Sequence, residues 1–395
     1  MYRCEACGGS LGPALFEISD LPLVDSFSST PLLAADVPKF SIAVCQCNNC
    51  STIQIASPPD TSEIYKNYLY ESSSSPDLES HFTKFAAFVS ELVVNRESPV
   101  LEIGANDGLL LGHLAAHGFS RLVAVDPSPQ TASIQLEQVE VVNDFFSSVS
   151  MRSYENGSFS TIIANNCFSH IPRLSDALKL CAELLHQDGS IIVEVQSTLD
   201  LVEEVVFDYI YHEHYFYHSA TSFAKLAGIA GLEVYSIHHV DTKGGSYRFL
   251  LGHPGRHLVD GSVRYWAFRE EVAGLHSIVT WRRLQAYLQQ VRAWVHDWVA
   301  ASDAPIFGYG ACATGTVFLN YMGLGTVLCA IVDDNVKRQG LFAPGTSIPV
   351  LALDQVSEGS RCLLLAWRHR SLILPKLREM GVSSLTPLPS VIIDV

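Results

Sequence analysis

A ten-residue stretch of the sequence, from Tyr209 to His218, concentrates side chains that can move protons. It contains four tyrosines, three histidines and one glutamate, more polar side chains than a packed core accommodates. His212 and His214 could chelate a metal ion, because alternate residues of a strand share a face, but Glu213 would then point away and no third ligand is adjacent. Histidine and tyrosine can remove or shuttle a proton near neutral pH, so the stretch favours acid–base chemistry over metal binding.

A second group of candidate residues surrounds a glycine-containing loop at residues 102–108. This loop closes an apolar strand and opens a helix, so its backbone can approach a ligand and the new helix offers free N–H groups. Its spacing is not G-x-G-x-x-G, and it has no Walker lysine. Asp126 ends the next predicted strand, where a carboxylate can accept both ribose hydroxyls. Asp144 and Phe145 could add a carboxylate and aromatic packing for adenine, and Asn165 ends a further strand facing the same crevice.

This acidic loop suits a ligand with a cationic amino-acid end better than a pyrophosphate, and it therefore favours S-adenosylmethionine over NAD as the cofactor. The alternative is a doubly wound sheet whose turns happen to be rich in glycine and aspartate. His170 follows the same predicted strand as Asn165, at the edge where such a sheet places its site. A single histidine is more often structural, so this position alone does not assign a role.

Four cysteines form two C-x-x-C pairs, Cys4 with Cys7 and Cys47 with Cys50. Two such pairs can present four thiolates to a tetrahedral zinc ion in a closed, structural site without a catalytic role. The gap between the pairs is about twice that of a standard zinc ribbon, and Cys45 could compete as a ligand. The alternatives are a redox C-x-x-C motif, which would occur once at the start of a helix, or unrelated thiols.

The elements that must position these residues follow from the hydrophobic pattern. Residues 77–95 carry apolar side chains at helical spacing, and from residue 99 apolar strands alternate with helices, as in a buried parallel sheet. Residues 263–300 read as one long helical stretch, followed by three strand-like segments. We therefore expect an α/β protein with a zinc ribbon-like module at residues 1–66, a doubly wound sheet at 67–240 and a smaller Rossmann-like domain at 241–395.

The net charge of −16 argues against a protein that coats nucleic acid, because neutralising phosphates needs clustered lysine and arginine. No segment looks like a secretory signal, and no apolar run approaches the length that spans a membrane. We expect a soluble cytoplasmic protein, a monomer or weak dimer, that acts on a small molecule and binds neither nucleic acid nor membrane.

Nearly the whole chain resembles the sugar C-methyltransferases, which alkylate the carbon next to the ketone of nucleotide-linked 4-keto-6-deoxy sugars. The resemblance lies, in order, in the paired C-x-x-C motifs, YLYESSSS, EIGANDG, NNCFSHIP, FDYIYHEHYFYHS, KGGSYR and the C-terminal GYGACATG, VDDN and QGLFAPGTSIPV. EIGANDG is common to many class I methyltransferases, whereas YIYHEH together with the four-cysteine module is specific. The family implies that the central sheet is a class I methyltransferase sheet.

The resemblance also implies the roles of individual residues. The sugar would be surrounded by Tyr70, His170, Tyr211, Glu213 and His214, with His214 as the base, Tyr211 and Tyr70 as alternates and Glu213 orienting. The enolate would attack the methyl group of S-adenosylmethionine in line, and the 4-keto group would make a catalytic metal unnecessary. The cofactor positions would be Glu102, Gly104, Asn106, Asp107, Asp126, Asp144, Phe145 and Asn165. The nucleotide-sugar would be held by Lys243, Gly244, Ser246 and Arg248, with the lysine and arginine as local cations unless they lie on a solvated hairpin.

Two departures from the family lie in the C-terminal region. The GYGA loop is not followed by the usual lysine, and a Pro-Trp-Asn of the relatives is replaced by Ala366-Trp367-Arg368. We expect these changes to concern the sugar or nucleotide and not the methyl-transfer residues. Alternative functions are methylation of a non-sugar natural product, an NAD-dependent oxidoreductase that uses Gly308, Gly310, Gly315 and Asp333, and a zinc-ribbon binding module on a degenerate scaffold.

Overall fold

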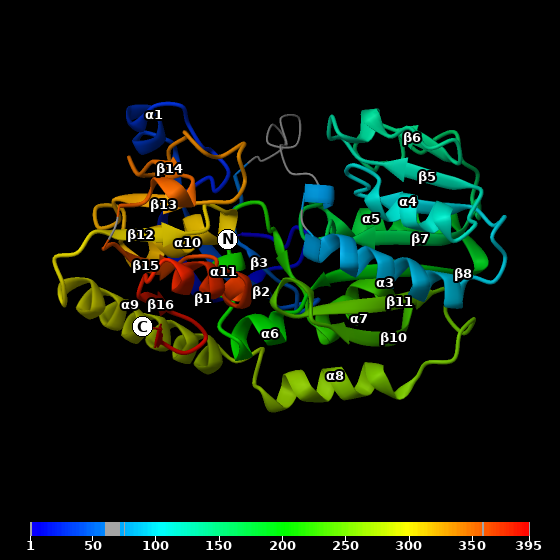
Figure 1. Cartoon of the computed structure of the whole chain (residues 1–395). Coiled ribbons are helices and arrows are strands. Elements are labelled where there is room, and N and C mark those ends of the chain that lie inside the picture. The colour runs from blue at the N-terminus through cyan, green and yellow to red at the C-terminus, as the bar shows by residue number, and fades with distance from the viewer. Residues whose placement is uncertain (1, 60–71, 75, 358, 395) are drawn as a thin grey trace.

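The computed structural model describes residues 2–59, 72–74, 76–357 and 359–394, so the predicted catalytic residue Tyr70 lies outside the described residues. Within this part of the chain the strands form three sheets of four, seven and six strands. Figure 1 shows the seven-stranded sheet in one half of the molecule and the six-stranded sheet in the other. This arrangement confirms the predicted α/β class.

The N-terminal sheet is antiparallel and has the order β1-β2-β3-β9. Along β2 the apolar side chains of Ile42 and Val44 point into the core while their neighbours are less buried, the alternation expected of a sheet with one buried face. The fourth strand comes from residues 209–218, far along the chain, which we call the proton-transfer stretch because its histidines and tyrosines are predicted to move protons. The strands are β1 (Leu11–Pro22), β2 (Lys39–Cys47), β3 (Ile53–Ile55) and β9 (Phe216–Tyr217), with the short helix α1 (Pro31–Ala35) between the first two.

The central sheet has the order β10-β11-β8-β7-β4-β5-β6, in which the strands from β8 to β6 are parallel and β11 is antiparallel to both of its neighbours. All four residues of β4 are buried, as expected where helices cover both faces. In sheet order the strands are β10 (Glu233–Val240), β11 (Ser246–Gly252), β8 (Leu185–Gln196), β7 (Phe159–Asn165), β4 (Val100–Ile103), β5 (Leu122–Val125) and β6 (Val139–Val142).

Helices cover both faces of this sheet, which confirms the predicted doubly wound architecture. Phe85 of α3 and Leu111 of α4 pack in one core cluster with Ile163 of the sheet, whereas Leu178 of α5 and Phe223 of α7 pack in a second cluster with alternate residues of the same strands. The helices are α3 (Pro76–Leu92), α4 (Leu109–Ala116), α5 (Leu174–Leu184) and α7 (Ala220–Ile229). Strand β11 follows the predicted domain boundary at residues 240 and 241 yet belongs to this sheet, so that boundary falls inside the β10–β11 hairpin.

The C-terminal sheet is parallel except for its last strand and has the order β14-β13-β12-β15-β16-β17. Its strands are β12 (Ile306–Tyr309), β13 (Ala330–Val332), β14 (Val350–Leu351), β15 (Arg361–Leu364), β16 (Ser384–Thr386) and β17 (Ile392–Asp394), and its helices include α10 (Ala313–Met322) and α11 (Arg370–Glu379). The N-terminal sheet packs against this domain, where Phe16 contacts Trp281 in a shared core cluster.

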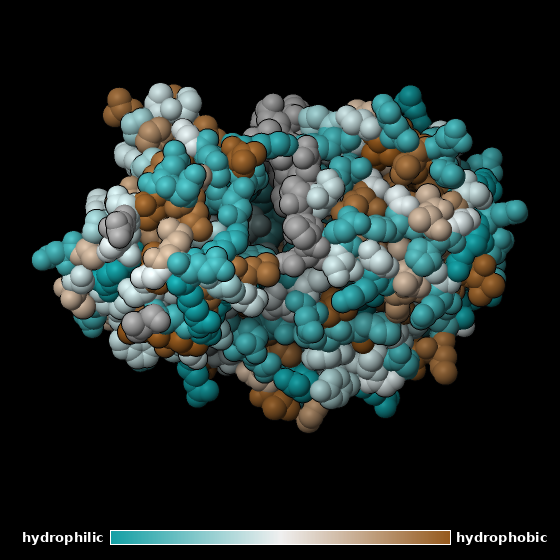
Figure 2. All heavy atoms as spheres, in the orientation of Figure 1, coloured by the Kyte–Doolittle hydropathy of each residue, from teal (hydrophilic) through white to brown (hydrophobic). Residues whose placement is uncertain are grey.

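The expected continuous helix over residues 263–300 is wrong: the structure has α8 (Gly261–Val272) and α9 (Ile278–Ala300). Gly274 adopts a left-handed conformation with φ of 63° between them, and the Ser277 side chain caps the new helix by accepting a hydrogen bond from the Val279 backbone. None of the described helices is long and apolar enough to cross a membrane. On the face shown in Figure 2, apolar side chains lie scattered among hydrophilic ones.

Candidate active site

A cavity of about 490 Å³ lies at the carboxyl ends of the central parallel strands. Ile103, Val125 and Asn165, which end β4, β5 and β7, all contribute to its wall. Phe82 also lines the cavity, from helix α3, which covers one face of the sheet. Doubly wound sheets bind their ligands at this edge, because the loops that follow parallel strands converge there.

Strained backbone conformations gather around this cavity. Among the described residues, seven that are not glycine have a positive φ, and four of these line the cavity: Asn106, Asn166, Arg173 and Lys243, with φ between 49° and 54°. Such residues cost free energy and persist where the surrounding structure imposes them, typically at functional sites. The clustering, which is independent of any motif, makes this cavity the candidate functional site.

Two buried polar atoms in the cavity wall are left without a hydrogen-bond partner among the described residues. They are Oε2 of Glu102 and Nδ2 of Asn165, an acceptor and a donor. Burial raises the pKa of Glu102 well above its ordinary value, and the nearby carboxylates of Asp126 and Asp107 raise it further. A bound ligand that supplies a cation at Glu102 and an acceptor at Asn165 would satisfy both atoms.

The other predicted cofactor residues divide into two groups. Gly104, Asn106, Asp126 and Phe145 line the cavity, whereas Asp107 and Asp144 do not. The Asp107 carboxylate accepts a hydrogen bond from the Ser73 backbone at 2.8 Å. Asp144 is exposed and caps the backbone N–H of the following residue at 2.7 Å.

The loop after β4 also binds the short segment at residues 72–74, which lies beside the cavity. Asn106 Oδ1 accepts a hydrogen bond from the Ser72 backbone at 3.0 Å, next to the bond between Ser73 and Asp107. Ser72 itself lines the cavity. These two loop side chains therefore anchor the short turn η1 (Ser72–Ser74) over the site.

The rings of His170 and His214 lie against each other, with their centroids 4.8 Å apart in an edge-to-face arrangement, and His214 lines a small separate pocket beside the cavity. His170 lines the cavity, and its Nδ1 donates to the carbonyl of Glu213 at 2.9 Å. His214 Nδ1 donates to the carbonyl of Tyr209 at 2.8 Å. Burial lowers the pKa of His170 to about 4 and that of His214 well below its ordinary value, with further lowering from nearby positive charge. Both rings are therefore neutral at pH 7.

The remaining residues of the proton-transfer stretch point in different directions. The Tyr211 ring packs on His214 with centroids 4.1 Å apart. His212 instead donates to the carbonyl of Phe40 in β2 at 3.1 Å. Among the described residues, neither histidine belongs to a group that could hold a metal ion, so the structure gives the metal alternative no support.

The carboxyl group of Glu213 lies near that of Asp25. Its side chain is buried, and burial together with the negative charge of Asp25 raises its pKa to about 8. The group is therefore mostly protonated at neutral pH. Glu213 orients His170 through its backbone carbonyl, which accepts the Nδ1 hydrogen bond.

The N-terminal sheet holds the proton-transfer stretch in place. Strand β3 pairs with β9, and the backbone N–H of Ile55 donates to the carbonyl of Tyr215 at 3.0 Å. Together with the bond between His212 and Phe40, these contacts fix the segment that carries His214. The first 59 residues therefore support the site although they contribute no lining residue to the cavity.

The predicted substrate-binding segment 243–248 is split between two environments. Lys243 lines the cavity, whereas Gly244 lies against Val206, and Ser246 Oγ donates to the Thr242 carbonyl at 3.0 Å. The expected role of Arg248 as a local cation for a substrate needs correction, because its guanidinium lies in the sheet interior. It donates two hydrogen bonds to Glu194, at 2.8 and 3.0 Å, since the two residues face each other on β11 and β8.

A second cation at the cavity was not anticipated from the sequence. Arg173 lines it, is exposed, and takes a left-handed conformation just before α5. The sequence did offer a partial indication that Arg173 lies at the site, because this residue directly follows the NNCFSHIP motif. Arg173 and Lys243 are the arginine and lysine side chains among the described cavity-lining residues.

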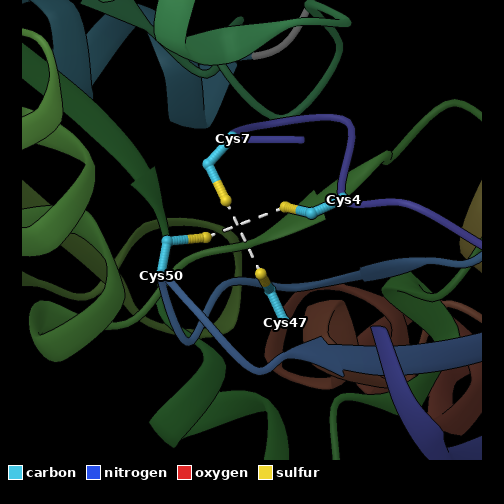
Figure 3. Close-up of side chains that lie close together, drawn as sticks. All are labelled: Cys4, Cys7, Cys47 and Cys50. Atoms are coloured by element: carbon cyan, nitrogen blue, oxygen red, sulfur yellow. Dashed lines mark hydrogen bonds between the residues drawn. The ribbon is translucent and has the colours of Figure 1, made fainter. Parts of the chain in front are cut away.

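The four predicted zinc ligands converge on one point (Figure 3). All four Sγ atoms of Cys4, Cys7, Cys47 and Cys50 lie within 4.8 Å of one another, with Cys4 and Cys50 3.7 Å apart and Cys7 and Cys47 3.6 Å apart. Tetrahedral zinc with bonds of about 2.3 Å holds its sulfur atoms about 3.8 Å apart, so the group has the dimensions of a closed four-thiolate zinc site. Cys45, considered as a competing ligand, is not part of the group.

The glycine-rich segment of the C-terminal domain is accounted for by packing. A Cβ atom at Gly310 would collide with Ala366, and one at Gly315 would collide with the carbonyl of Gly310. Asp333, which a dinucleotide would need for its ribose, already accepts hydrogen bonds from the backbone of Ala311 at 2.7 Å and Asn335 at 2.8 Å. These contacts give the oxidoreductase alternative no support.

Comparison with known proteins agrees with this geometry. Residues 78–237 match a family described as a methyltransferase domain, and residues 241–389 match one described as the C-methyltransferase C-terminal domain. The chain is 28% identical to the C-methyltransferase NovU of Streptomyces niveus over 410 aligned positions, which cover 98% of this chain and 95% of NovU.

Among solved structures, the chain is similar to 1,6-didemethyltoxoflavin-N1-methyltransferase from Burkholderia thailandensis, with a TM-score of 0.39, 17% identity and coverage of 53% of this chain and 93% of that one. It is also similar to the CcbJ methyltransferase from Streptomyces caelestis, with a TM-score of 0.36, 15% identity and coverage of 49% and 96%. The two family matches and the near full-length similarity to NovU show that the chain belongs to the family of S-adenosylmethionine-dependent C-methyltransferases.

Proposed function

We propose that the enzyme methylates the carbon next to the ketone of a nucleotide-linked 4-keto-6-deoxy sugar. The observation that carries this proposal is a pair of neutral histidines, in which His170 lines the same cavity as Glu102 and Asn165 and His214 packs against His170. C-methylation at such a carbon begins with removal of a proton, and a neutral imidazole can accept one. The sugar itself rests on the sequence motifs shared with the sugar C-methyltransferases.

The residues of the cavity fit S-adenosylmethionine. We assign its cationic amino group to Glu102, its ribose hydroxyls to Asp126, and its adenine to Phe145 and Asn165. The unpartnered atoms of Glu102 and Asn165 support this assignment, since a cofactor with a cation and an aromatic acceptor would complete their hydrogen bonding. When bound, S-adenosylmethionine supplies an electrophilic methyl group.

His214 is the base in this proposal. Its Nδ1 is occupied by the Tyr209 carbonyl, which leaves the Nε2 lone pair as the proton acceptor. The carbon–hydrogen bond of the substrate breaks, the proton moves to Nε2, and the electron pair is delocalised onto the ketone oxygen. The same electron pair would then form the new bond to the methyl carbon as the methyl–sulfur bond breaks, with S-adenosylhomocysteine as the leaving group. Tyr211, packed on His214, and Tyr70, outside the described residues, are the alternate bases.

Lys243 and Arg173 are the cations that we assign to the diphosphate of the substrate. Burial lowers the pKa of Lys243, although the nearby Glu194 raises it. The positive charge of Lys243 contributes to the lowered pKa values of both histidines. A diphosphate bound at Lys243 would offset that charge, so the bound substrate would make His214 a stronger base than it is in the free enzyme.

The proposal is tested with the purified protein, S-adenosylmethionine and a panel of nucleotide 4-keto-6-deoxy sugars and non-sugar ketones. Mass spectrometry should find one added methyl group on at least one nucleotide sugar. His214→Ala should abolish turnover and leave the affinity for S-adenosylhomocysteine unchanged, whereas His117→Gln, which alters an exposed histidine at the end of α4, should keep turnover. Methylation of a non-sugar ketone alone would exclude the sugar, and normal turnover by His214→Ala would exclude His214 as the base.

A further inference from the structure

Two consecutive residues of the C-terminal domain, Trp367 and Arg368, donate hydrogen bonds to the buried carboxylate of Asp208, which lies close in sequence to the proposed base. Trp367 Nε1 donates to Asp208 Oδ2 at 2.9 Å, and Arg368 Nη1 lies 2.8 and 3.0 Å from the two carboxylate oxygens. Asp208 is fully buried in the turn η3 (Phe207–Tyr209), and Trp367 and Arg368 belong to the turn η6 (Trp367–His369) that follows β15. The sequence analysis expected the changes at residues 366–368 to concern the sugar or nucleotide, whereas the described contacts of Trp367 and Arg368 are with Asp208 and Tyr209.

Arg368 also covers the aromatic ring of Tyr209. Its guanidinium carbon lies 4.6 Å from the centroid of the Tyr209 ring, within the range of a cation–π contact. The ring of Tyr209 also lies next to that of His214, and the two rings are parallel within 6° at a centroid distance of 5.9 Å. Tyr209 is therefore placed between a cation from the C-terminal domain and the proposed base.

The backbone of Tyr209 completes the connection. Its carbonyl accepts the Nδ1 hydrogen bond of His214, and that bond decides which ring nitrogen carries the proton. A turn fixed by Asp208 and Arg368 keeps this carbonyl in place. Because Asp208 balances the charge of Arg368 at close range, the arginine acts on His214 through geometry and not through its own field.

We propose that Arg368 is a positioning residue for the reaction. Through Asp208 and Tyr209 it holds His214 in the tautomer with Nδ1 protonated and Nε2 available to the substrate. This inference rests on the proposed function, because it takes His214 as the base. It assigns to the C-terminal domain a part in proton removal, besides any contact with the substrate.

The matched variants are Arg368→Gln and Arg370→Gln. Both remove one positive charge from the same stretch, but Arg370 pairs with Asp394 at 3.2 Å on β17, away from Tyr209. Arg368→Lys tests rescue, because lysine keeps the charge and loses the planar contact with the ring. The double variant Asp208→Asn with Arg368→Gln leaves no unpaired buried charge, and it keeps the test open if Arg368→Gln alone fails to fold.

The first measurement is the tautomer of His214, read from the side-chain nitrogen shifts of histidine-labelled protein and assigned with His214→Ala. We expect Nδ1–H in the wild type and in Arg370→Gln, and a mixture of tautomers in Arg368→Gln and the double variant. This readout needs no substrate, so it tests the inference even if the panel of nucleotide sugars yields no product. Unchanged tautomers in both Arg368 variants would overturn it.

The second measurement separates positioning from folding. A displaced catalytic group can lower the rate about a hundredfold, so we expect kcat to fall about 10- to 100-fold in Arg368→Gln. KM and the affinity for S-adenosylhomocysteine should change less than about twofold, and Arg368→Lys should recover part of kcat. Exchange of the substrate carbon proton with deuterated solvent should fall in parallel with kcat. Loss of cofactor affinity together with kcat would show a structural role and refute the inference.

Discussion

His170 and His214 meet edge to face, and each donates its Nδ1 proton to a backbone carbonyl of the same ten-residue stretch. The acceptors are Glu213 for His170 and Tyr209 for His214, so the stretch that carries one histidine also fixes the other. Both rings are buried next to Lys243, and burial together with nearby positive charge lowers the pKa of each. The pair is therefore a site for neutral imidazole, which is the form that can accept a proton.

The pH dependence of catalysis should show this directly. Because burial lowers the folded pKa of His214 well below the ordinary histidine value, the base of the free enzyme stays neutral as the pH falls through 6.5. We expect kcat/KM to show no inflection near pH 6.5. The unfolded chain does take up protons there, so stability should decline as the pH falls below about 6.5. An inflection of kcat/KM near pH 6.5, without loss of structure, would indicate a solvated base and contradict this geometry.

Replacement of Lys243 should separate substrate binding from base strength. Lys243→Met removes a charge that lowers the pKa of both histidines, so the acid limb of kcat/KM should move to higher pH while KM for an anionic substrate rises. The control is Lys179→Met, because Lys179 lies on the exposed side of α5 and pairs only loosely, at 3.9 Å, with Asp176. A rise in KM with an unmoved pH profile would show that Lys243 binds substrate without influencing the base.

Much of the fold follows from local pattern. The buried apolar strands before Gly104 and Asp126 predicted the central sheet, because continuous apolar runs between turns suit strands covered on both faces. Other features could not be predicted this way. Strand β9 has only Phe216 and Tyr217, and it exists because β3 supplies a pairing edge from far away in the sequence. The break between α8 and α9 depends on one glycine within otherwise helical spacing.

The candidate site, like the fold, has some features that the sequence predicts and others that depend on contacts between distant residues. Cys4, Cys7, Cys47 and Cys50 were predictable because spacing alone constrains a four-thiolate site. Arg248 was misplaced, since nothing in KGGSYR reveals that Glu194 faces it across two strands. The clamp of Asp208 by Trp367 and Arg368 joins residues about 160 positions apart, and its partners meet only when the two domains pack.

Arg248 should matter for stability and not for substrate affinity. Arg248→Met removes the guanidinium that pairs with the buried carboxylate of Glu194 and leaves His81 Nε2, at 2.6 Å, and the nearby Lys243 as its neighbours. Breaking a buried pair on one side costs about 3–5 kcal/mol, so the free energy of unfolding in urea should fall by about that amount. Arg256→Gln is the control, because its pair with Asp188 is exposed, and its loss should cost less than about 1 kcal/mol. An increased KM at unchanged stability would instead show that Arg248 binds the substrate.

The four-cysteine cluster should be required for turnover although it lies outside the cavity. Metal analysis should find about one zinc ion per chain, as expected for a closed four-thiolate site. Cys47→Ser should lose the metal, and β2 and β3 then lose the support that the cluster gives them. Because β3 pairs with β9 and Ile55 binds the Tyr215 carbonyl, we expect the segment that carries His214 to loosen and kcat to fall. S-adenosylhomocysteine should still bind, since the loop after β4 makes none of these contacts.

Cys45→Ser provides the matched control for this prediction. Cys45 is a buried neighbour of Cys47 on the same strand, but its sulfur is not part of the four-thiolate group. The variant should therefore keep both zinc and turnover, which separates loss of the metal from damage to β2. Full activity in a zinc-free Cys47→Ser protein would show that the cluster does not support the active site. Zinc loss in Cys45→Ser would place a fifth cysteine at the metal and require a different ligand set.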